Sequence, residues 1–528
     1  IVNNFGTVTG RVNLTNSNTF TNSGTWDLAD TVSDFNASGD STVVNKGLII
    51  AAKDSANAEI SAIDNLDTFN NDGGTIRLAD GGVGDVFRIN ADASGVSGSG
   101  DGNFEANGGM IELDIALGDS SANVDQVTID GDLTLAGAPT QLVIDTVSAT
   151  TNGNPVGEIE VVTVGNSSDA GALTLGSPVE GGAFVYELTQ GQCDDGSTAN
   201  WYLCYTDQPG PAAAVFEAMP SVLLSTFARA ESLQQRVGSR IERREGLDGP
   251  DAPQDGGEGF WMRTWGDYAE VTPDTSSAGA ELDGDSYGVQ AGISRLLSAG
   301  ESGELMGSAS LRYGNTRTEV SNDFGGGVLK AEGHGLGLGL TWYAESGFYA
   351  DANVAADWVR TDARSKGAGE LLSGYEDTVL SASTELGHRI VVDRKSAVVP
   401  QLQLSWGEVS DDKLEDELGN AVEFNERSQL IGRLGLAVER RVTDTPYGSG
   451  KVYAFGNVLH DFSDEREVRY AGADLTQSSA GTYGEFGGGF SLMAGETTNF
   501  YGQLAYREAV EDVEAQAHSL SVGLRMQF

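Results

Sequence analysis

Several features that enzymes and helical membrane proteins rely on are scarce in this chain of 528 residues. It has only 2 cysteines and 4 histidines, and all the histidines lie after residue 330. No window supplies the roughly 18–20 consecutive apolar residues that a membrane-spanning helix needs. Proline is also scarce, at 11 residues against 72 glycines, which argues against collagen-like and proline-rich disordered chains. The length predicts two or more domains.

Basic residues are few, and the formal net charge is −47. Phosphate backbones would be repelled by such a surface, so we expect no nucleic-acid partner. The acidity is typical of large secreted or surface-displayed proteins. The stretch Gly81–Asp85 is similar to the calcium-binding nonapeptide repeat, but its Asp is one position early and the unit does not recur. We therefore expect no metal and no cofactor.

Residues 1–118 carry a degenerate repeat. Phe20–Leu28, Phe69–Leu78 and Phe104–Leu113 each place an Asn/Gly turn before a short strand with apolar residues two positions apart. One such unit cannot bury its apolar face alone, whereas stacked units can. The repeat predicts a β-solenoid, with an ordinary β-sandwich as the alternative.

Residues 119–208 contain longer predicted strands, which indicate a cap on the solenoid. A cap would protect the open strand edge from aggregation. Cys193 and Cys204 lie close together in this region. In an oxidising compartment they can form a disulfide across a Gly/Asp/Ser-rich stretch, and two free thiols are the alternative.

Residues 209–257 form a linker in which 212–245 is the one convincing helix. This segment is rich in Ala, Leu, Glu, Gln and Arg and has no Asn or Asp, and Pro220 should kink it. A solvated surface helix is one interpretation. Its arginines stand out in an acidic protein: Arg229, Arg236, Arg240, Arg243 and Arg244.

From residue 258 to 528 the sequence alternates apolar and polar residues in long segments. We expect about twelve antiparallel strands, at roughly 260–269, 284–297, 303–320, 328–344, 347–362, 374–392, 396–410, 421–442, 450–462, 478–494, 497–508 and 517–528. In Gly333–Trp342 glycines alternate with leucines. This pattern predicts a transmembrane β-barrel with a leucine face toward lipid and a glycine face that leaves room in the lumen. A soluble β-sandwich is the alternative.

The final strand has one apolar face and ends on an aromatic residue. We expect the side chains of this apolar face to point outward from the barrel: Leu520, Val522, Leu524, Met526 and Phe528. This ending resembles the signal that outer-membrane proteins present to their assembly machinery.

The order of these segments resembles the type Va autotransporters of type V secretion, with pertactin-like passenger domains. Gly259–Arg263 is similar to the family's first barrel strand, and Tyr483–Gly487 to a late strand with an inward Glu. Asp125–Gly131 and Asn200–Leu203 resemble its autochaperone region. The resemblance implies an all-β fold with a right-handed parallel β-helix, a short linker helix and a 12-stranded barrel. It also implies an outer-membrane barrel and a passenger on the cell surface.

The resemblance implies that the helix stays in the lumen, with its arginines facing inward carboxylates. Glu385 and Glu485 are the candidates by strand parity. Expected partners are outer-membrane lipid, the barrel-assembly machinery, periplasmic chaperones and a surface ligand of the passenger. Some family members cut the passenger loose with an Asn in this helix. Residues 212–245 have no Asn, so we expect no such self-cleavage.

Residues 1–210 contain no histidine, so they cannot assemble a Ser-His-Asp triad or a typical zinc site. A carboxylate-pair glycosidase stays open. Ile1 begins inside a repeat with no visible signal peptide, so we expect a longer precursor. We predict a non-enzymatic, adhesive passenger. The alternative is a surface protease or esterase with its catalytic domain before Ile1.

Overall fold

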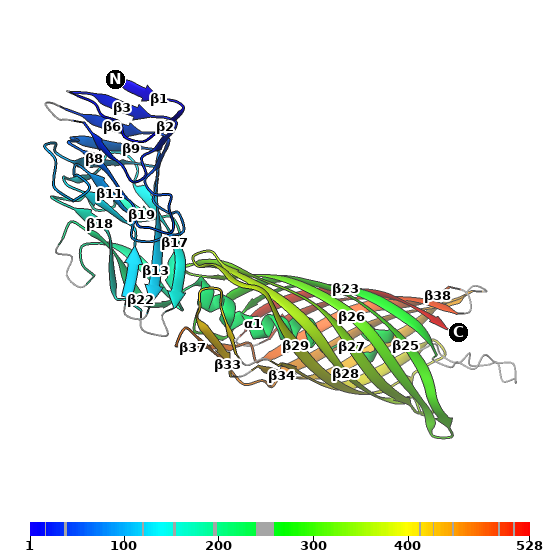
Figure 1. Ribbon diagram of the computed structural model, residues 1–528. Helices are drawn as coiled ribbons and strands as arrows, with labels where there is room; N and C mark the ends of the chain where they lie inside the picture. The colour runs from blue at the N-terminus through cyan, green and yellow to red at the C-terminus, as the bar shows by residue number, and fades with distance from the viewer. Residues whose placement is uncertain are drawn as a thin grey trace.

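The computed structural model of the chain consists of an N-terminal stack of short strands and a C-terminal barrel that contains a helix (Figure 1). The structure describes residues 1–15, 17–35, 40–118, 121–150, 155–193, 198–238, 258–410, 413–425, 427–445, 448–494, 497–510 and 513–527. Within these ranges, no helix combines the length and the apolar character needed to cross a membrane.

The N-terminal stack is a β-solenoid made of three sheets with mainly parallel pairing. The first sheet contains β1 (Val2–Asn4), β3 (Thr19–Asn22), β6 (Thr42–Asn45), β9 (Thr68–Asp72), β12 (Asn103–Asn107) and β16 (Leu133–Leu135). The second contains β2 (Thr7–Thr9), β4 (Thr25–Asp27), β7 (Leu48–Ile50), β10 (Thr75–Arg77), β13 (Met110–Gly118), β17 (Thr140–Thr150) and β19 (Leu173–Leu175), with β14 (Ser121–Val124) beside β13. The third begins with β5 (Val32–Asp34), β8 (Ile60–Asp64), β11 (Val86–Ile89), β15 (Gln126–Ile129) and β18 (Glu158–Val164). The predicted solenoid is confirmed.

Aromatic and aliphatic side chains stack from one rung to the next inside the solenoid. Phe69 lies beside Phe104 in register, and their rings stack with centroids 5.4 Å apart. The recurring Asn residues have a separate role. Asn22 donates to Asn45, and Asn45 donates to Asn71, each over 3.0 Å in the buried interior. The Asn/Gly repeat is therefore a ladder of buried amides that satisfy one another.

The solenoid ends in antiparallel strands. β22 (Trp201–Pro209) pairs with β18 and with β21 (Phe184–Gln190), and β21 pairs with β20 (Val179–Gly181). Cys193 and Cys204 form a disulfide that links the β21–β22 connection to strand β22. Antiparallel pairing interrupts the rung pattern, so this region closes the stack.

The C-terminal half is a closed antiparallel barrel. Among the described residues its twelve long strands are β23 (Gly259–Thr272), β25 (Glu281–Gly300), β26 (Gly303–Asn322), β27 (Gly325–Tyr343), β28 (Phe348–Ser365), β29 (Gly369–His388), β31 (Ser396–Val409), β34 (Ser428–Thr445), β35 (Gly448–Asp461), β38 (Thr482–Ala494), β39 (Thr498–Ala509) and β40 (Glu514–Gln527). β23 pairs with β40, and β29 pairs with β31 across the two-residue strand β30 (Ile390–Val391), which closes the ring. The predicted barrel is confirmed.

The outer surface of the barrel is apolar in the middle of the strands. Leu336, Leu338 and Leu340 are each at least half exposed, while the glycines between them are buried toward the lumen. A soluble protein would cover such a surface, whereas lipid solvates it. In the last strand, Leu520, Val522 and Met526 are exposed and Leu524 is half-buried. Phe528 lies outside the described residues.

The predicted single helix over 212–245 is wrong in its extent. The structure has α1 (Pro211–Phe227) and α2 (Leu233–Val237), and the residues between them are not helical. A new helix starts at Ser232, whose hydroxyl and backbone form a capping box with Gln235. Pro220 lies inside α1. Residues 239–257, and with them Arg240, Arg243 and Arg244, lie outside the described residues.

A five-stranded sheet covers the end of the barrel next to the solenoid, called here the solenoid end. It is made by loops between barrel strands: β24 (Thr275–Ser276), β32 (Lys413–Glu415), β33 (Ala421–Phe424), β36 (Arg466–Tyr470) and β37 (Ala473–Ser478). The expected strand 421–442 is thus divided, because β33 joins this loop sheet and only β34 belongs to the barrel.

Candidate functional site in the barrel lumen

Helix α1 fills the lumen at the solenoid end of the barrel (Figure 1). It is buried on nearly every side, as expected of a helix enclosed by protein. Barrel glycines make the space for it. A Cβ on Gly333 or Gly314 would press on the ring of Phe227, and one on Gly407 would collide with Ala228. The glycine face of β27 therefore accommodates a helix, as the sequence predicted.

The loop sheet packs on the same helix. Tyr470 of β36 contacts Phe216 with ring centroids 4.6 Å apart, and the Tyr470 side chain is fully buried. Glu217 of α1 accepts hydrogen bonds from the Ser276 hydroxyl at 2.5 Å and the Ala278 backbone N–H at 2.8 Å. These contacts surround α1 with side chains and close this end of the lumen.

The first helical turn is capped by a residue of the solenoid. Gly210 gives α1 no side-chain cap, and its first turn has no acidic residue. Instead, Glu180 of β20 accepts a hydrogen bond from the Ala212 N–H at 2.6 Å and one from the Ser365 hydroxyl of β28. Glu180 is fully buried, and burial raises the pKa of its carboxyl group. One carboxylate thus joins the solenoid cap, the helix and the barrel.

A group of ion pairs occupies the break between α1 and α2. Arg229 pairs with Asp267 of β23 and with Glu231, and Glu231 also pairs with Arg263. The guanidinium groups of Arg229 and Arg263 lie 5.6 and 5.1 Å from the ring centroid of Trp265. Buried charges of this kind are stable only when they are paired.

The last turn of α1 is held by a barrel residue. Arg312 of β26 donates a hydrogen bond to the carbonyl oxygen of Phe227 at 3.0 Å. The same guanidinium forms an ion pair with Asp357 of β28. A cation at this position satisfies a carbonyl that has no partner within the helix.

Helix α2 is attached to several strands of the barrel wall. Arg236 pairs with Asp351 of β28, and the Tyr501 hydroxyl donates to the Arg236 carbonyl at 3.1 Å. Glu385 accepts from the Leu233 N–H at 3.0 Å and from Arg433 at 2.9 Å. Glu385 therefore caps the helix.

The predicted lumen residues are thus placed with different partners than expected. Arg229 and Arg236 do face barrel carboxylates, but these are Asp267 and Asp351. Glu485 is buried in the lumen and pairs with Arg507 at 2.9 Å. The alternation of residues along each strand correctly predicted that Glu385 and Glu485 point into the lumen. It could not predict how far along the barrel axis each side chain lies, and so which arginine it would meet. The pattern Ser232-x-x-Gln235 was the available signal for the second helix.

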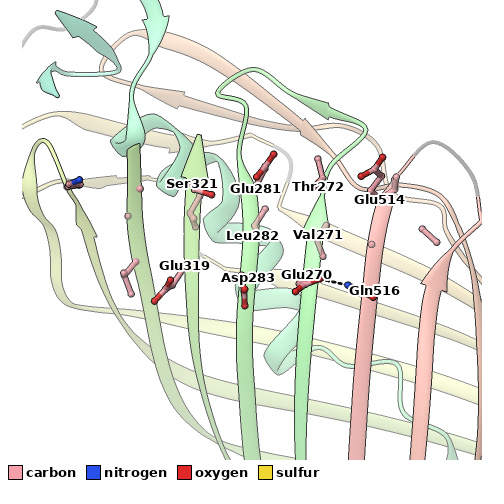
Figure 2. A pocket seen from close by; sticks show the side chains of 18 of the residues that line it. Glu270, Val271, Thr272, Glu281, Leu282, Asp283, Glu319, Ser321, Glu514 and Gln516 are labelled. Atoms are coloured by element: carbon pink, nitrogen blue, oxygen red, sulfur yellow. Dashed lines mark hydrogen bonds between the residues drawn. The ribbon is translucent and has the colours of Figure 1, made fainter. Parts of the chain in front are cut away.

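Carboxylates line the outer face of the barrel near the solenoid end. A hollow of about 1030 Å³ is bordered there by Glu270, Glu281, Asp283, Glu319 and Glu514 (Figure 2). Figure 2 shows these side chains on neighbouring strands, with Gln516 donating to Glu270. Exposed acidic groups belong in water, so the apolar band that faces lipid ends below them.

Comparison with known proteins identifies the barrel. Residues 260–505 match the family model described as Autotransporter beta-domain. The barrel is an autotransporter β-domain. The Adhesin BmaC autotransporter of Brucella suis is 27% identical over 461 residues, which cover 81% of this chain and 13% of that protein. The Pertactin autotransporter of Bordetella bronchiseptica is 28% identical over 284 residues, covering 53% of this chain and 29% of that protein.

The fold matches a solved autotransporter as well. The crystal structure of the transport unit of AIDA-I from Escherichia coli aligns over 61% of this chain and 100% of that chain, with a TM-score of 0.50 and 17% identity. The autotransporter β-domain places the barrel in the outer membrane and the attached solenoid at the cell surface. The chain spans less than a third of the length of the adhesin and pertactin relatives it matches.

Proposed function

We propose that the barrel exports the solenoid through its own lumen, retains it on the cell surface, and that the solenoid acts by binding rather than by catalysis. One observation carries the export step. The chain leaves the solenoid at Pro209, passes into the lumen as α1, and continues to β23 in the barrel wall. A linker that runs through the pore in this way is in the position expected for the last segment of an exported polypeptide.

Folding outside the cell supplies a direction for this export. The capping region 119–208 emerges first if the passenger moves with its C-terminal end leading. Its antiparallel strands can pair with one another before further rungs are added. Each new rung then adds to a preformed edge, and a folded rung is too wide to return.

Retention of the solenoid follows from the residues in the lumen. Helices α1 and α2 contain no Asn or Asp, so self-cleavage by attack of an Asn side chain on its own backbone cannot occur in them. The ion pairs of Arg229 and Arg236 and the cap by Glu180 hold the segment in place.

The name of one relative supports adhesion as the activity of the solenoid. The Brucella suis protein is named an adhesin, and residues 1–210 here lack histidine. We further propose that the last strand is recognised by the barrel-assembly machinery, that periplasmic chaperones hold the chain before insertion, and that the solenoid binds a ligand on a neighbouring surface.

The experiment displays the full chain on bacteria and treats intact cells with a protease. We expect the protease to cut the chain outside the barrel and release the solenoid, whole or in fragments, while a heat-modifiable barrel of residues 258–528 stays in the outer-membrane fraction. A periplasmic marker protein that remains intact is the control. A solenoid that stays attached and cannot be labelled by antibody on intact cells, or a native N-terminus within 212–238, would contradict the proposal. Attachment of these cells to epithelial monolayers, compared with cells lacking the chain, tests adhesion.

A further inference from the structure

A cavity remains in the lumen beside α1, at the solenoid end. Its volume is about 280 Å³, and apolar, polar and charged side chains all line it. Ser221 and Ser225 of α1 line it on one side, and Arg466, Ser479 and Tyr483 line it from the loop sheet and β38. A space of this size holds several water molecules or a small ion.

Arg466 is the unusual residue of this cavity. It lies on the inward face of β36, and only 3% of its surface is exposed. Among the described residues no acceptor lies within hydrogen-bond distance of its Nε, and no carboxylate lies within 4.0 Å of the guanidinium. Arg229 and Arg507 line the same cavity and are each paired with a carboxylate. Arg466 is thus a buried cation without a partner in the described chain.

A second unpartnered donor lies next to it. Gln477 of β37 is the direct cross-strand neighbour of Arg466 in the register. Its side chain is fully buried, and its Oε1 accepts from the Ser221 hydroxyl at 2.6 Å. Its Nε2 has no acceptor in the part of the chain that the structure describes. Side chains of directly opposed residues on one face of an antiparallel pair lie about 5 Å apart at Cβ.

Two adjacent buried donors require an acceptor, and one of them carries a positive charge. A buried donor without an acceptor costs free energy, and the cost is larger for a charged group. Burial also lowers the pKa of the Arg466 guanidinium, as expected for a cation that lacks a counter-ion. A water molecule in the cavity can accept a hydrogen bond from Arg466, but it leaves the charge uncompensated. An oxyanion accepts this bond and neutralises the charge.

We propose that Arg466 binds a small oxyanion in this cavity, beside the helix, and that its cross-strand neighbour Gln477, which does not border the cavity, supports the site from β37. The Ser479 hydroxyl and the Tyr483 side chain border the same space and give the anion a polar surround. The anion would be held between the loop sheet, the barrel wall and α1. Its binding would therefore stabilise the closed end of the lumen.

Five carboxylates border the cavity. Glu231, Asp267 and Glu485 are paired with arginines, whereas Asp285 and Asp461 form no ion pair among the described residues. Asp461 of β35 borders the cavity, and its Oδ1 accepts from the Ser463 backbone N–H at 3.0 Å and from the Ser463 hydroxyl. Its negative charge acts on Arg466 from beyond ion-pair distance. If an oxyanion binds beside Arg466, Asp461 repels it, and removal of this charge should strengthen binding.

Inorganic phosphate is the probe, and the full chain purified in detergent is the protein. Isothermal titration with sodium phosphate, at ionic strength matched with sodium chloride, should show one bound anion for each chain. The midpoint of thermal unfolding should rise by a few degrees at 20-fold excess over the dissociation constant. We expect Arg466→Gln to weaken binding at least tenfold and Asp461→Asn to strengthen it.

The matched control is Arg469→Gln. Arg469 is on the same strand as Arg466 but on the opposite, exposed face, so this variant should bind phosphate like the unmodified chain. Absence of phosphate binding by the unmodified chain would overturn the proposal, and so would equal binding by Arg466→Gln. Unchanged or weaker binding in Asp461→Asn would overturn the placement of the anion beside Arg466.

Discussion

The carboxylate of Glu180 accepts the backbone hydrogen bond of Ala212 over 2.6 Å, although the two residues belong to the solenoid cap and to the lumen helix. The helix has no capping side chain of its own. Its N-terminus is therefore completed only when the cap is folded and seated on the barrel. This contact links the state of the passenger to the closure of the pore.

Replacement of Glu180 tests that link. Glu180→Ala leaves the Ala212 N–H and the Ser365 hydroxyl without their buried acceptor, at a cost of about 2 kcal/mol. We expect faster protease cleavage near residues 206–212 and intermittent ion conductance in planar bilayers. Glu180→Gln keeps an acceptor oxygen and should show a smaller effect. Equal cleavage and conductance in all three proteins would contradict the link.

The ion pairs at the helix break should contribute strongly to barrel stability. Glu231→Ala deprives the buried Arg263 of its carboxylate, and loss of one partner of a buried pair costs about 3–5 kcal/mol. We expect the Glu231→Ala barrel to change from its folded to its unfolded gel mobility at a lower temperature than the unmodified barrel. Arg317→Ala is the control, because its pair with Glu319 is exposed and contributes less than about 1 kcal/mol. Similar shifts in both variants would show that the buried ion pairs between α1 and α2 stabilise the barrel no more than an exposed pair does.

The lumen glycines should be required for the helix rather than for the barrel. Gly333→Leu places a side chain where the Phe227 ring lies. We expect a barrel that still inserts and shows heat-modifiable mobility but conducts ions continuously. Gly456→Leu is the matched control, since no atom lies within 4 Å of a Cβ at this position. A closed pore in Gly333→Leu would show that the helix tolerates displacement.

Particular residues show how far the sequence alone could lead. The alternation in Gly333–Trp342 predicted both faces of β27, because the two-residue period of a strand is a local property. The partners of Arg229 and Arg236 could not be predicted, because they depend on how far each strand is shifted along the barrel. The end of α1 at Phe227 was missed for a similar reason. Residues 228–232 favour a helix locally, and their conformation is set by ion pairs to distant strands.

The disulfide between Cys193 and Cys204 should stabilise the cap. It closes a short loop between β21 and β22, and a bridge of this kind contributes about 2–3 kcal/mol. In the variant with both cysteines changed to serine we expect a lower urea midpoint for protease resistance of residues 119–208. The barrel should keep its unfolding temperature, which serves as the internal control. An unchanged urea midpoint would show that hydrogen bonds alone hold the hairpin.

The solenoid should gain stability in mild acid. Asp85 and Asp125 are buried, and the Asp85 N–H donates to the Asp125 carboxylate at 3.0 Å. Burial raises the pKa of each carboxyl to about 6, from an ordinary value of 3.8. Because the folded pKa lies above the unfolded one, protonation favours folding. The contribution is complete below pH 3.8 and is lost as the pH rises through about 6.

We therefore expect the free energy of unfolding of the solenoid, measured with urea, to be higher at pH 5 than at pH 7.5, by on the order of 1 kcal/mol. Asp85→Asn keeps an acceptor for the Glu59 N–H and removes one charge, so it should raise stability at pH 7.5 and reduce the pH dependence. Asp92→Asn is the control. Hydrogen bonds from Ser94 and Val96 lower the pKa of Asp92, so loss of its charge should not stabilise the fold. If acid lowers the midpoint in the unmodified chain, the buried carboxyls are not the groups that control it.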